Sequence, residues 1–386
     1  MGEKKFITPR LIIHGGAGSI TRTNLPPDSA SYRAYVSSLS AIVKETFPLL
    51  TSHNTALDVA VHAVKLLEDN PLFNAGKGAV FTTEGKNELE ASVMVSGGPG
   101  AEKRGVGVAM LKRVKNPIAL AAQLLVASEG SDGRGGRHNF MSGSEAEMLA
   151  ERWGVELVDE DYFWSEKRWQ EHLKDLERNP DGRTQYDVDE LEEYLPMGTV
   201  GAVALDVFGN ICVATSTGGL TNKLPGRIGD TPTLGAGFWA EQWDEKQDRP
   251  EMSQSQARLG TGFGGPVKSI SVGDTKRAVG ISGTGNGDFF LKLQACHSIA
   301  SRMKFAGASL QHASEVMVGS GGEMEKAGPT GKGQGGIIGI EHSGTGESSI
   351  VWDLNCGGMF RAYMDDDGQV KVAVFADEEP FAVQEE

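Results

Sequence analysis

The chain has 386 residues, of which 39% are hydrophobic and 23% are charged, a balance typical of a globular protein. Its formal net charge of −15 argues against a nucleic-acid partner, because phosphate binding requires a basic surface. No apolar run approaches the ~20 residues of a membrane-spanning helix, so no membrane partner is expected.

Cysteine and histidine spacing argues against disulfides and structural zinc. Three widely separated cysteines, Cys212, Cys296 and Cys356, are expected to be reduced thiols. The eight histidines form no cluster with one another or with cysteine. The amino-terminal residues lack the apolar core of a signal peptide and no Asn-x-Ser/Thr sequon occurs, so cytoplasm is the expected location.

Helices are prominent in the first part of the chain. A short strand, Leu11–Ile13, runs into the motif His14-Gly-Gly-Ala-Gly18. Helical spacing of apolar residues predicts helices over 56–68 and 117–127, the second with Asn116 as its N-cap. Residues 105–111 between them are expected to form a buried strand.

The stretch 156–196 changes in character. It is dense in acidic and basic residues and contains Asn179-Pro-Asp-Gly182. This composition predicts a flexible, solvated linker with some local helix at 165–176.

Strands dominate the rest of the chain. Apolar, β-branched runs predict them at 199–205, 211–215, 277–282, 336–341, 349–354, 359–364 and 370–375. A helix is expected over 288–305, and the polar segment 241–276 is expected to be an insertion loop. Early helices followed by strands joined by short turns predict an α/β layered domain with largely antiparallel sheets.

The dipeptide Gly198–Thr199 is a candidate for self-cleavage. A threonine hydroxyl is a poor nucleophile unless a base lies beside it, and the threonine's own free α-amino group can be that base. Such an amine titrates near pH ~8, close to where a general base works best. Within the chain Thr199 has no free amine, so the bond before it must first break. Gly198 suits this step because, without a Cβ, it lets a hydroxyl approach its carbonyl carbon.

Two charged residues in Gly226-Arg-Ile-Gly-Asp230 can recognise a free amino acid. Arg227 offers a bidentate fork for a carboxylate, and Asp230 offers a counter-charge for an ammonium. An Arg and an Asp three residues apart are more often a surface pair, so the interpretation depends on the neighbouring motifs.

Hydroxyl and amide donors occur in two further motifs. In Ser282-Gly-Thr-Gly-Asn-Gly287, the Thr284 hydroxyl and the Gly285 N–H can hold the oxyanion that forms when Thr199 attacks an amide. Thr217, one strand away, can support the Thr199 hydroxyl. The same glycine-rich run resembles half of a dinucleotide fingerprint, so a nucleotide-binding protein stays open as an alternative.

Taken together, six motifs resemble the plant-type (class 2) asparaginases with isoaspartyl aminopeptidase activity, a family of N-terminal nucleophile (Ntn) hydrolases. The resemblance covers about residues 11–374. The motifs are His14-Gly-Gly-Ala-Gly18, Asn74-Ala-Gly-x-Gly78, Gly198-Thr-Val-Gly201, Thr215-Ser-Thr-Gly-Gly219, Gly226-Arg-Ile-Gly-Asp-Thr-Pro232 and Thr284-Gly-x-Gly-Asp288.

The resemblance implies one domain over 1–386 with a four-layer αββα sandwich. It implies autocleavage before Thr199 into an α chain, 1–198, and a β chain, 199–386, which stay associated, with a dimer of αβ units. It implies hydrolysis of L-asparagine and of β-aspartyl (isoaspartyl) dipeptides, with no cofactor in the chemistry.

The resemblance also implies a role for each site residue. Thr199 is the nucleophile and its amine the base, and Thr217 is a supporting hydroxyl. The α-carboxylate of the substrate goes to Arg227, the α-ammonium to Asp230 and the Gly287 carbonyl, and the oxyanion to Thr284 and Gly285. Asn74 is similar to a family asparagine near the cleavage site, and the loop Leu67–Phe73 resembles one that holds a structural sodium ion through backbone carbonyls.

Three features depart from the family pattern. Glu90 stands where the family usually carries Asp, and the insertion 241–276 is longer than usual. The run Asn286-Gly-Asp288 is closer to the glycosylasparaginases, so a glycosylasparaginase-like amidase is an alternative. An unprocessed, inactive relative is another.

Overall fold

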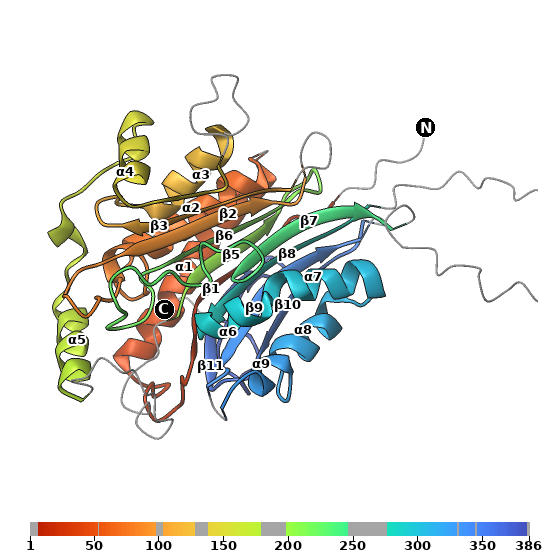
Figure 1. Ribbon diagram of the computed structural model, residues 1–386. Helices are drawn as coiled ribbons and strands as arrows, with labels where there is room; N and C mark the ends of the chain where they lie inside the picture. The colour runs from red at the N-terminus through yellow and green to blue at the C-terminus, as the bar shows by residue number, and fades with distance from the viewer. Residues whose placement is uncertain are drawn as a thin grey trace, which may run out of the picture.

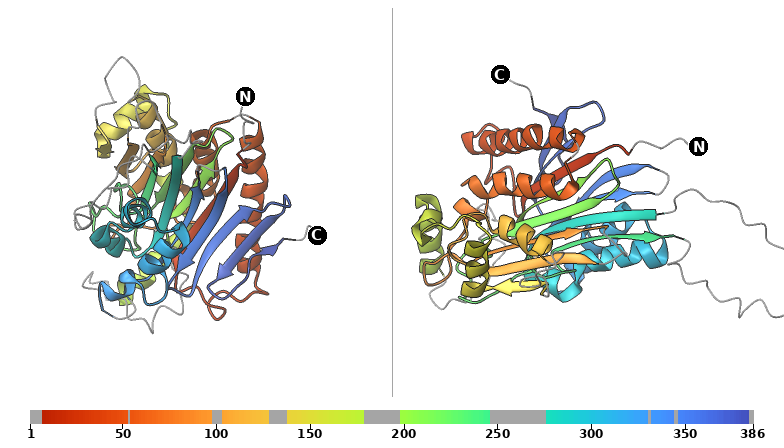
Figure 2. Two further views of the ribbon diagram at one scale, coloured as in Figure 1. Left: turned by 90° about the vertical axis from the view of Figure 1, so that its right-hand side faces the viewer. Right: turned by 90° about the horizontal axis from the view of Figure 1, so that it is seen from above.

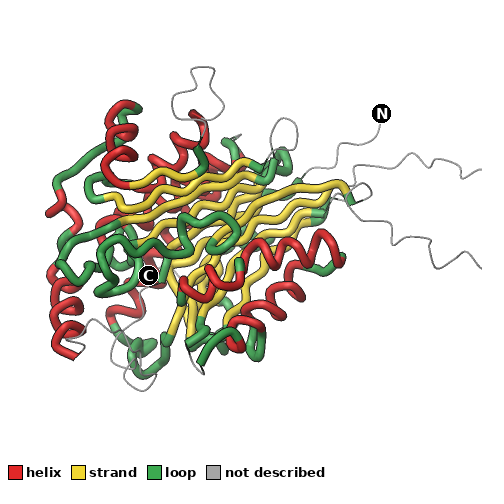
Figure 3. The backbone as a smooth tube through the Cα atoms, in the orientation of Figure 1, coloured by secondary structure: helices red, strands yellow, loops and turns green. Residues whose placement is uncertain are grey.

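In a computed structural model of the protein, residues 7–52, 54–97, 103–127, 138–178, 198–245, 276–329, 332–343 and 346–383 are described. Two sheets lie at the centre, with helices on their outer sides (Figures 1 and 3). Among the described helices, none is long and apolar enough to cross a membrane.

The larger sheet has nine strands in the order β13-β12-β11-β1-β5-β6-β2-β3-β4. Its neighbours are antiparallel except for β3 and β4, which are parallel. The strands are β1 Arg10–Gly18, β2 Leu89–Val95, β3 Arg104–Leu111, β4 Phe140–Ser142, β5 Val200–Leu205, β6 Ile211–Thr217, β11 Gly358–Met364, β12 Val370–Phe375 and β13 Phe381–Ala382.

The smaller sheet has four antiparallel strands in the order β10-β9-β8-β7. They are β7 Phe238–Asp244, β8 Lys276–Gly285, β9 Gly335–His342 and β10 Ser348–Leu354. A buried apolar cluster joins the two sheets, with Val203 and Val213 on one side and Ala240 and Ile340 on the other. Burial of this apolar surface holds the sheets face to face.

Helices cover the outer face of each sheet (Figure 2). The larger sheet is covered by α1 Ala30–Thr51, α2 Ala56–Asp69 and α3 Pro117–Ala127, and the smaller by α6 Gly287–Leu293, α7 Ala295–Ala306, α8 Leu310–Val318 and α9 Glu323–Lys326. At one end of the larger sheet lie the 3₁₀ turns η1 Gly76–Gly78 and η3 Glu160–Phe163 and the helices α4 Gly143–Arg152 and α5 Glu166–Arg178. The expected α/β class with largely antiparallel sheets is therefore confirmed.

Helix ends explain two of the boundaries. The α2 helix begins at Ala56 because Thr55 and Asp58 form a capping box, each side chain accepting the other's backbone N–H. At the start of α3 the N–H of Ile118 bonds the Glu68 carboxyl, whereas Asn116 donates its side-chain amide to Asp69. The side chain that caps α3 is thus supplied by α2.

The local helix expected at 165–176 is confirmed as α5, Glu166–Arg178, but the expectation of a flexible, solvated linker is wrong for 160–178, where η3 and α5 contribute buried side chains. This charged segment docks because Arg168 and His172 are buried against acceptors of the main body. Arg168 donates to the carbonyls of Gly78 and Leu72, and the His172 ring bonds the Asn222 side chain. The last part of the predicted linker, 179–196, lies outside the described residues.

Two other predicted boundaries change. The insertion expected at 241–276 begins inside β7 and ends inside β8, and 246–275 lies outside the described residues. The helix expected over 288–305 is two helices, because Gln294 has φ 47° and breaks the helical path between α6 and α7. The 22-residue helix α1 was missed altogether.

Candidate active site

The Gly198–Thr199 junction enters β5 in a space too small for a side chain on residue 198. A Cβ there would lie 2.5 Å from the Thr284 Oγ1 and 2.6 Å from the Ala17 backbone nitrogen. Next to Ala17 on β1, Gly16 has φ 119°, and a Cβ on Gly16 would lie 3.0 Å from the Gly198 nitrogen. The end of β1 therefore holds the peptide before Thr199 by direct backbone packing.

Two other hydroxyls surround Thr199, which is itself buried. The Thr199 Oγ1 lies 3.0 Å from the Thr231 Oγ1. The Thr284 hydroxyl, at the end of β8, donates to the Thr199 carbonyl over 3.0 Å. The nucleophile candidate thus lies between a hydroxyl from the β6–β7 loop and one from the smaller sheet.

Thr217 lies at the end of β6, next to the strand that carries Thr199. Val200 pairs with Ser216, so Thr199 and Thr217 each come one residue beyond this pair. The Thr217 hydroxyl accepts the Gly219 N–H over 3.0 Å. Beside the Thr199 hydroxyl lies Thr231, which sequence reasoning missed, although it directly follows Asp230 in the motif.

Arg227, Asp230 and Gly287 lie close together. A Cβ on Gly287 would lie 2.3 Å from the Asp230 Oδ1 and 3.2 Å from the Arg227 Nη2. Arg227 also donates to the Asp288 carboxylate over 2.8 Å. The absence of a side chain at Gly287 leaves the Arg227 guanidinium and the Asp230 carboxyl side by side, an arrangement that can pair with a carboxylate and an ammonium. We call Arg227 and Asp230 the clamp.

Burial dominates the electrostatics of the clamp. It raises the pKa of Asp230 to about 7, although the charge of Arg227 opposes the shift. Burial also acts to lower the pKa of Arg227, but the hydrogen bond and charge of Asp288, together with the charges of Glu90 and Asp230, outweigh it, so the Arg227 pKa is raised. Near neutral pH, Asp230 is thus poised between its neutral and ionised forms.

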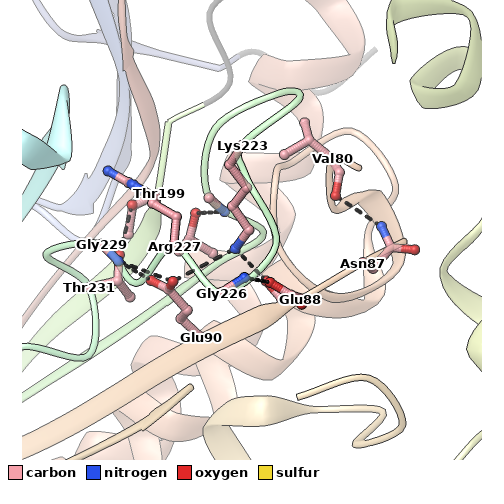
Figure 4. A network of polar contacts seen from close by, with 12 residues as sticks. Val80, Asn87, Glu88, Glu90, Thr199, Lys223, Gly226, Arg227, Gly229 and Thr231 are labelled. Carbon is pink, nitrogen blue, oxygen red and sulfur yellow. Dashed lines mark hydrogen bonds and ion pairs between the residues drawn. The ribbon is translucent and has the colours of Figure 1, made fainter. Parts of the chain in front are cut away.

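A polar network underlies the clamp (Figure 4). Both oxygens of Glu90 accept the Gly229 N–H, at 3.1 and 3.2 Å. Lys223 lies 3.7 Å from the Glu90 carboxylate and donates to the Glu88 carbonyl over 2.7 Å. Burial acts to raise the pKa of Glu90 and to lower that of Lys223, and the charge of each opposes the shift in the other.

The oxyanion candidates end β8. Gly285 has φ 134°, and a Cβ on it would lie 2.4 Å from the Gly335 Cα, so glycine is required there. Further back on β8, Ser282 Oγ lies 2.7 Å from the Nε2 of His14. Burial lowers the pKa of His14 to about 3, so this histidine is neutral and serves as a hydrogen-bonding group between the sheets.

Asn74 ties a neighbouring loop to the site. Its side chain donates to the Gly219 carbonyl over 2.8 Å and accepts the Val80 N–H over 3.0 Å. It therefore fixes the turn that follows Thr217.

The loop Leu67–Phe73 offers oxygen donors for a cation. Positions 76 and 78 are glycines, and a Cβ there would lie 2.5 Å from the Glu68 carbonyl oxygen and 2.1 Å from that of Phe73. Oxygen donors of this kind fit a hard cation such as sodium. Within the described ranges, no group of three or more His, Cys, Asp or Glu side chains could hold a metal ion. The three cysteines are free and buried.

Comparison with known proteins agrees with these motifs. The sequence model of a family described as Asparaginase matches residues 7–243 and 273–374, and the unmatched residues between lie in the expected insertion. The chain is 37% identical to an isoaspartyl peptidase of Escherichia coli over 92% of both chains. It is 31% identical to a putative isoaspartyl peptidase/L-asparaginase of Dictyostelium discoideum, again over 92% of both. A probable isoaspartyl peptidase/L-asparaginase of Arabidopsis thaliana is 28% identical over 95% of this chain and 98% of its own. The chain therefore belongs to the asparaginase family of hydrolases, as its motifs predict.

Proposed function

We propose that the protein is a threonine-nucleophile hydrolase that cleaves itself before Thr199 and then hydrolyses L-asparagine and β-aspartyl dipeptides. The observation that carries the proposal is the convergence, around one threonine, of two hydroxyls and an Arg–Asp clamp. The names of the relatives support the same substrates.

Self-cleavage begins when the Thr199 Oγ attacks the Gly198 carbonyl carbon. The peptide nitrogen leaves as the new amine of Thr199, and the acyl group moves to the oxygen as an ester. Water then hydrolyses this ester, which frees the Gly198 carboxylate and the Thr199 hydroxyl. Close packing of Gly16 and Ala17 on Gly198 supports a peptide that is held in place for attack at this bond.

Turnover uses the same oxygen. Arg227 binds the substrate α-carboxylate, while Asp230 and the Gly287 carbonyl bind the α-ammonium. The Thr199 amine accepts the hydroxyl proton as the oxygen attacks the side-chain carbonyl, and Thr284 with the Gly285 N–H stabilises the oxyanion. Ammonia or an amino acid leaves with that proton, and water clears the β-aspartyl ester to give aspartate.

The rest of the family arrangement is part of the proposal. We propose a four-layer αββα sandwich of the Ntn-hydrolase type, an αβ unit that dimerises, and a cytoplasmic location, supported by the buried free thiols. A sodium ion held by carbonyls of Leu67–Phe73 would stabilise the Asn74 loop without entering the chemistry. Replacement of sodium by choline should then lower the melting temperature.

Denaturing mass spectrometry tests the proposal directly. Purified protein should give two fragments, 1–198 and 199–386, whereas Thr199→Ala should give one uncut, inactive chain. A Thr199→Ala variant that still splits at this bond would refute the mechanism. Parallel assays with L-asparagine, a β-aspartyl dipeptide and a glycosylated asparagine then rank the substrates and test the glycosylasparaginase alternative.

A further inference from the structure

Glu90 connects β2 of the larger sheet to the clamp. It lies on β2, directly opposite Thr217 on β6. Its carboxylate accepts the Gly229 N–H, and Gly229 lies between Arg227 and Asp230 in the chain. The contacts of this one side chain therefore decide where the backbone between the two clamp residues lies.

The side chains of Arg227 and Glu90 both pack closely on Gly229. A Cβ there would lie 2.9 Å from the Arg227 Nη1 and 3.3 Å from the Glu90 Oε2. The guanidinium and the carboxylate thus approach the same peptide closely. A shift of the Glu90 carboxylate would move the Gly229 peptide and, with it, both clamp residues.

Lys223 is the counter-charge that makes a buried carboxylate tolerable at this place. The side chains of Glu90 and Lys223 are each 1% exposed, and their charged atoms lie 3.7 Å apart. An ionised carboxylate without a partner is costly to bury. Lys223 is held in turn by the Glu88 carbonyl and by close packing on Gly219, where a Cβ would lie 2.7 Å from its Nζ.

We propose that Glu90 and Lys223 are a positioning pair for the clamp: Lys223 keeps Glu90 ionised, and Glu90 fixes the Gly229 peptide so that Arg227 and Asp230 face the substrate together. The inference rests on the proposed amino-acid clamp and adds two residues to it. The groups that face the pair are the Arg227 guanidinium, the Asp230 and Glu88 carboxylates, and the Gly229 N–H.

Binding of L-aspartate, measured by calorimetry, tests the pair without depending on hydrolysis. Glu90→Gln and Lys223→Met should each weaken Kd about ten- to hundredfold, because a hydrogen bond to a charged group is lost or loosened. The double variant should be no weaker than either single variant, since the two side chains act as one unit. The double variant also leaves neither charge of the pair buried without its partner. It can therefore still be measured if a single variant fails to fold.

The pH dependence of L-aspartate binding distinguishes a positioning role of Glu90 from a role in folding stability alone. The charge of Glu90 contributes to the raised pKa of Asp230, so Glu90→Gln should shift the acid limb of L-aspartate binding to lower pH. Glu341→Gln removes a carboxylate from a partly buried ion pair, with Arg277 at the opposite end of β8, and should leave binding and its pH dependence unchanged.

Three results would overturn the inference. The first is wild-type protein that does not bind L-aspartate, and the second is single variants that bind within twofold of wild type. The third is losses that multiply in the double variant. Wild-type protein that binds L-aspartate without hydrolysing L-asparagine would instead refute the proposed reaction and leave the positioning result to be judged from Kd.

Discussion

The hydroxyl oxygens of Thr199 and Thr231 lie 3.0 Å apart, although 32 residues separate them in the chain. Thr231 is almost fully buried, and its carbonyl accepts the Ser92 hydroxyl of β2 over 2.6 Å. Its position is therefore fixed by the larger sheet. A fixed hydroxyl beside a nucleophilic hydroxyl can orient it or relay its proton.

Replacement of this hydroxyl should impair both cleavage and turnover. Thr231→Val keeps the shape but removes the bond to Thr199, and we expect a loss of about ten- to hundredfold in the rate of self-cleavage and in kcat. Time courses of fragment formation and ammonia release measure the two rates. Thr46→Val removes an equally buried hydroxyl, which bonds Ile42 within α1, and should change neither rate. Equal losses in both variants would count against a special role for Thr231.

Alanine at position 198 should block maturation. Its Cβ would meet the Thr284 hydroxyl and the Ala17 backbone at 2.5 and 2.6 Å, and backbone atoms cannot yield as a flexible side chain can. We expect Gly198→Ala to accumulate as the full-length chain, which denaturing electrophoresis would show. Rapid, complete cleavage of Gly198→Ala would mean that the close packing plays no part in the reaction.

Acid should weaken the clamp. Because burial raises the pKa of Asp230 to about 7, this carboxyl becomes neutral below that pH and loses its attraction for an ammonium. Competitive inhibition by L-aspartate should weaken about tenfold per pH unit below about 7. Succinate, which is L-aspartate without the ammonium, is the matched inhibitor and should show no such loss. The same acid limb for both inhibitors would remove Asp230 from ammonium binding.

Glu68 should make the fold less stable as the pH rises. Burial raises its pKa from 4.5 to about 8, and its Oε2 has no hydrogen-bond partner. The unfolded chain releases this proton near pH 4.5 and the folded protein only near 8, so its contribution to stability is present at low pH and is lost across this window.

Glu68→Gln removes that titration. The free energy of unfolding of Glu68→Gln relative to that of wild type should increase by about 1.4 kcal/mol for each pH unit as the pH rises from 5 to 8. Urea denaturation at several pH values measures the gain, with Glu315→Gln, an exposed carboxylate of α8, as the control. A constant difference across the range would contradict the shifted pKa.

The parts of the site that could be predicted from sequence are the residues that lie within short motifs. Arg227 and Asp230 are three residues apart, and their residue types alone indicate groups that can bind a carboxylate and an ammonium. Thr199 stands out because it follows a glycine at the start of an apolar run. For these residues the local chain supplies most of the geometry.

Contacts between distant segments could not be predicted in the same way. Glu90 and Gly229 are 139 residues apart, and His14 and Ser282 are 268 apart. Such pairs exist only after strands from both halves of the chain have assembled. The docking of α5 was missed for the same reason. The charged composition of α5 does not show that Arg168 donates hydrogen bonds to carbonyls of the 72–78 loop.

The strand order of the larger sheet has a consequence for the mature enzyme. Strand β1, from before the proposed scission point, is flanked by β11 and β5 from after it, and β6 borders β2 across the same divide. The two polypeptides would be joined by backbone hydrogen bonds at three seams, β11–β1, β1–β5 and β6–β2, so neither could separate without disrupting the sheet. Nicking should therefore leave one cooperative melt in which both pieces denature at the same temperature.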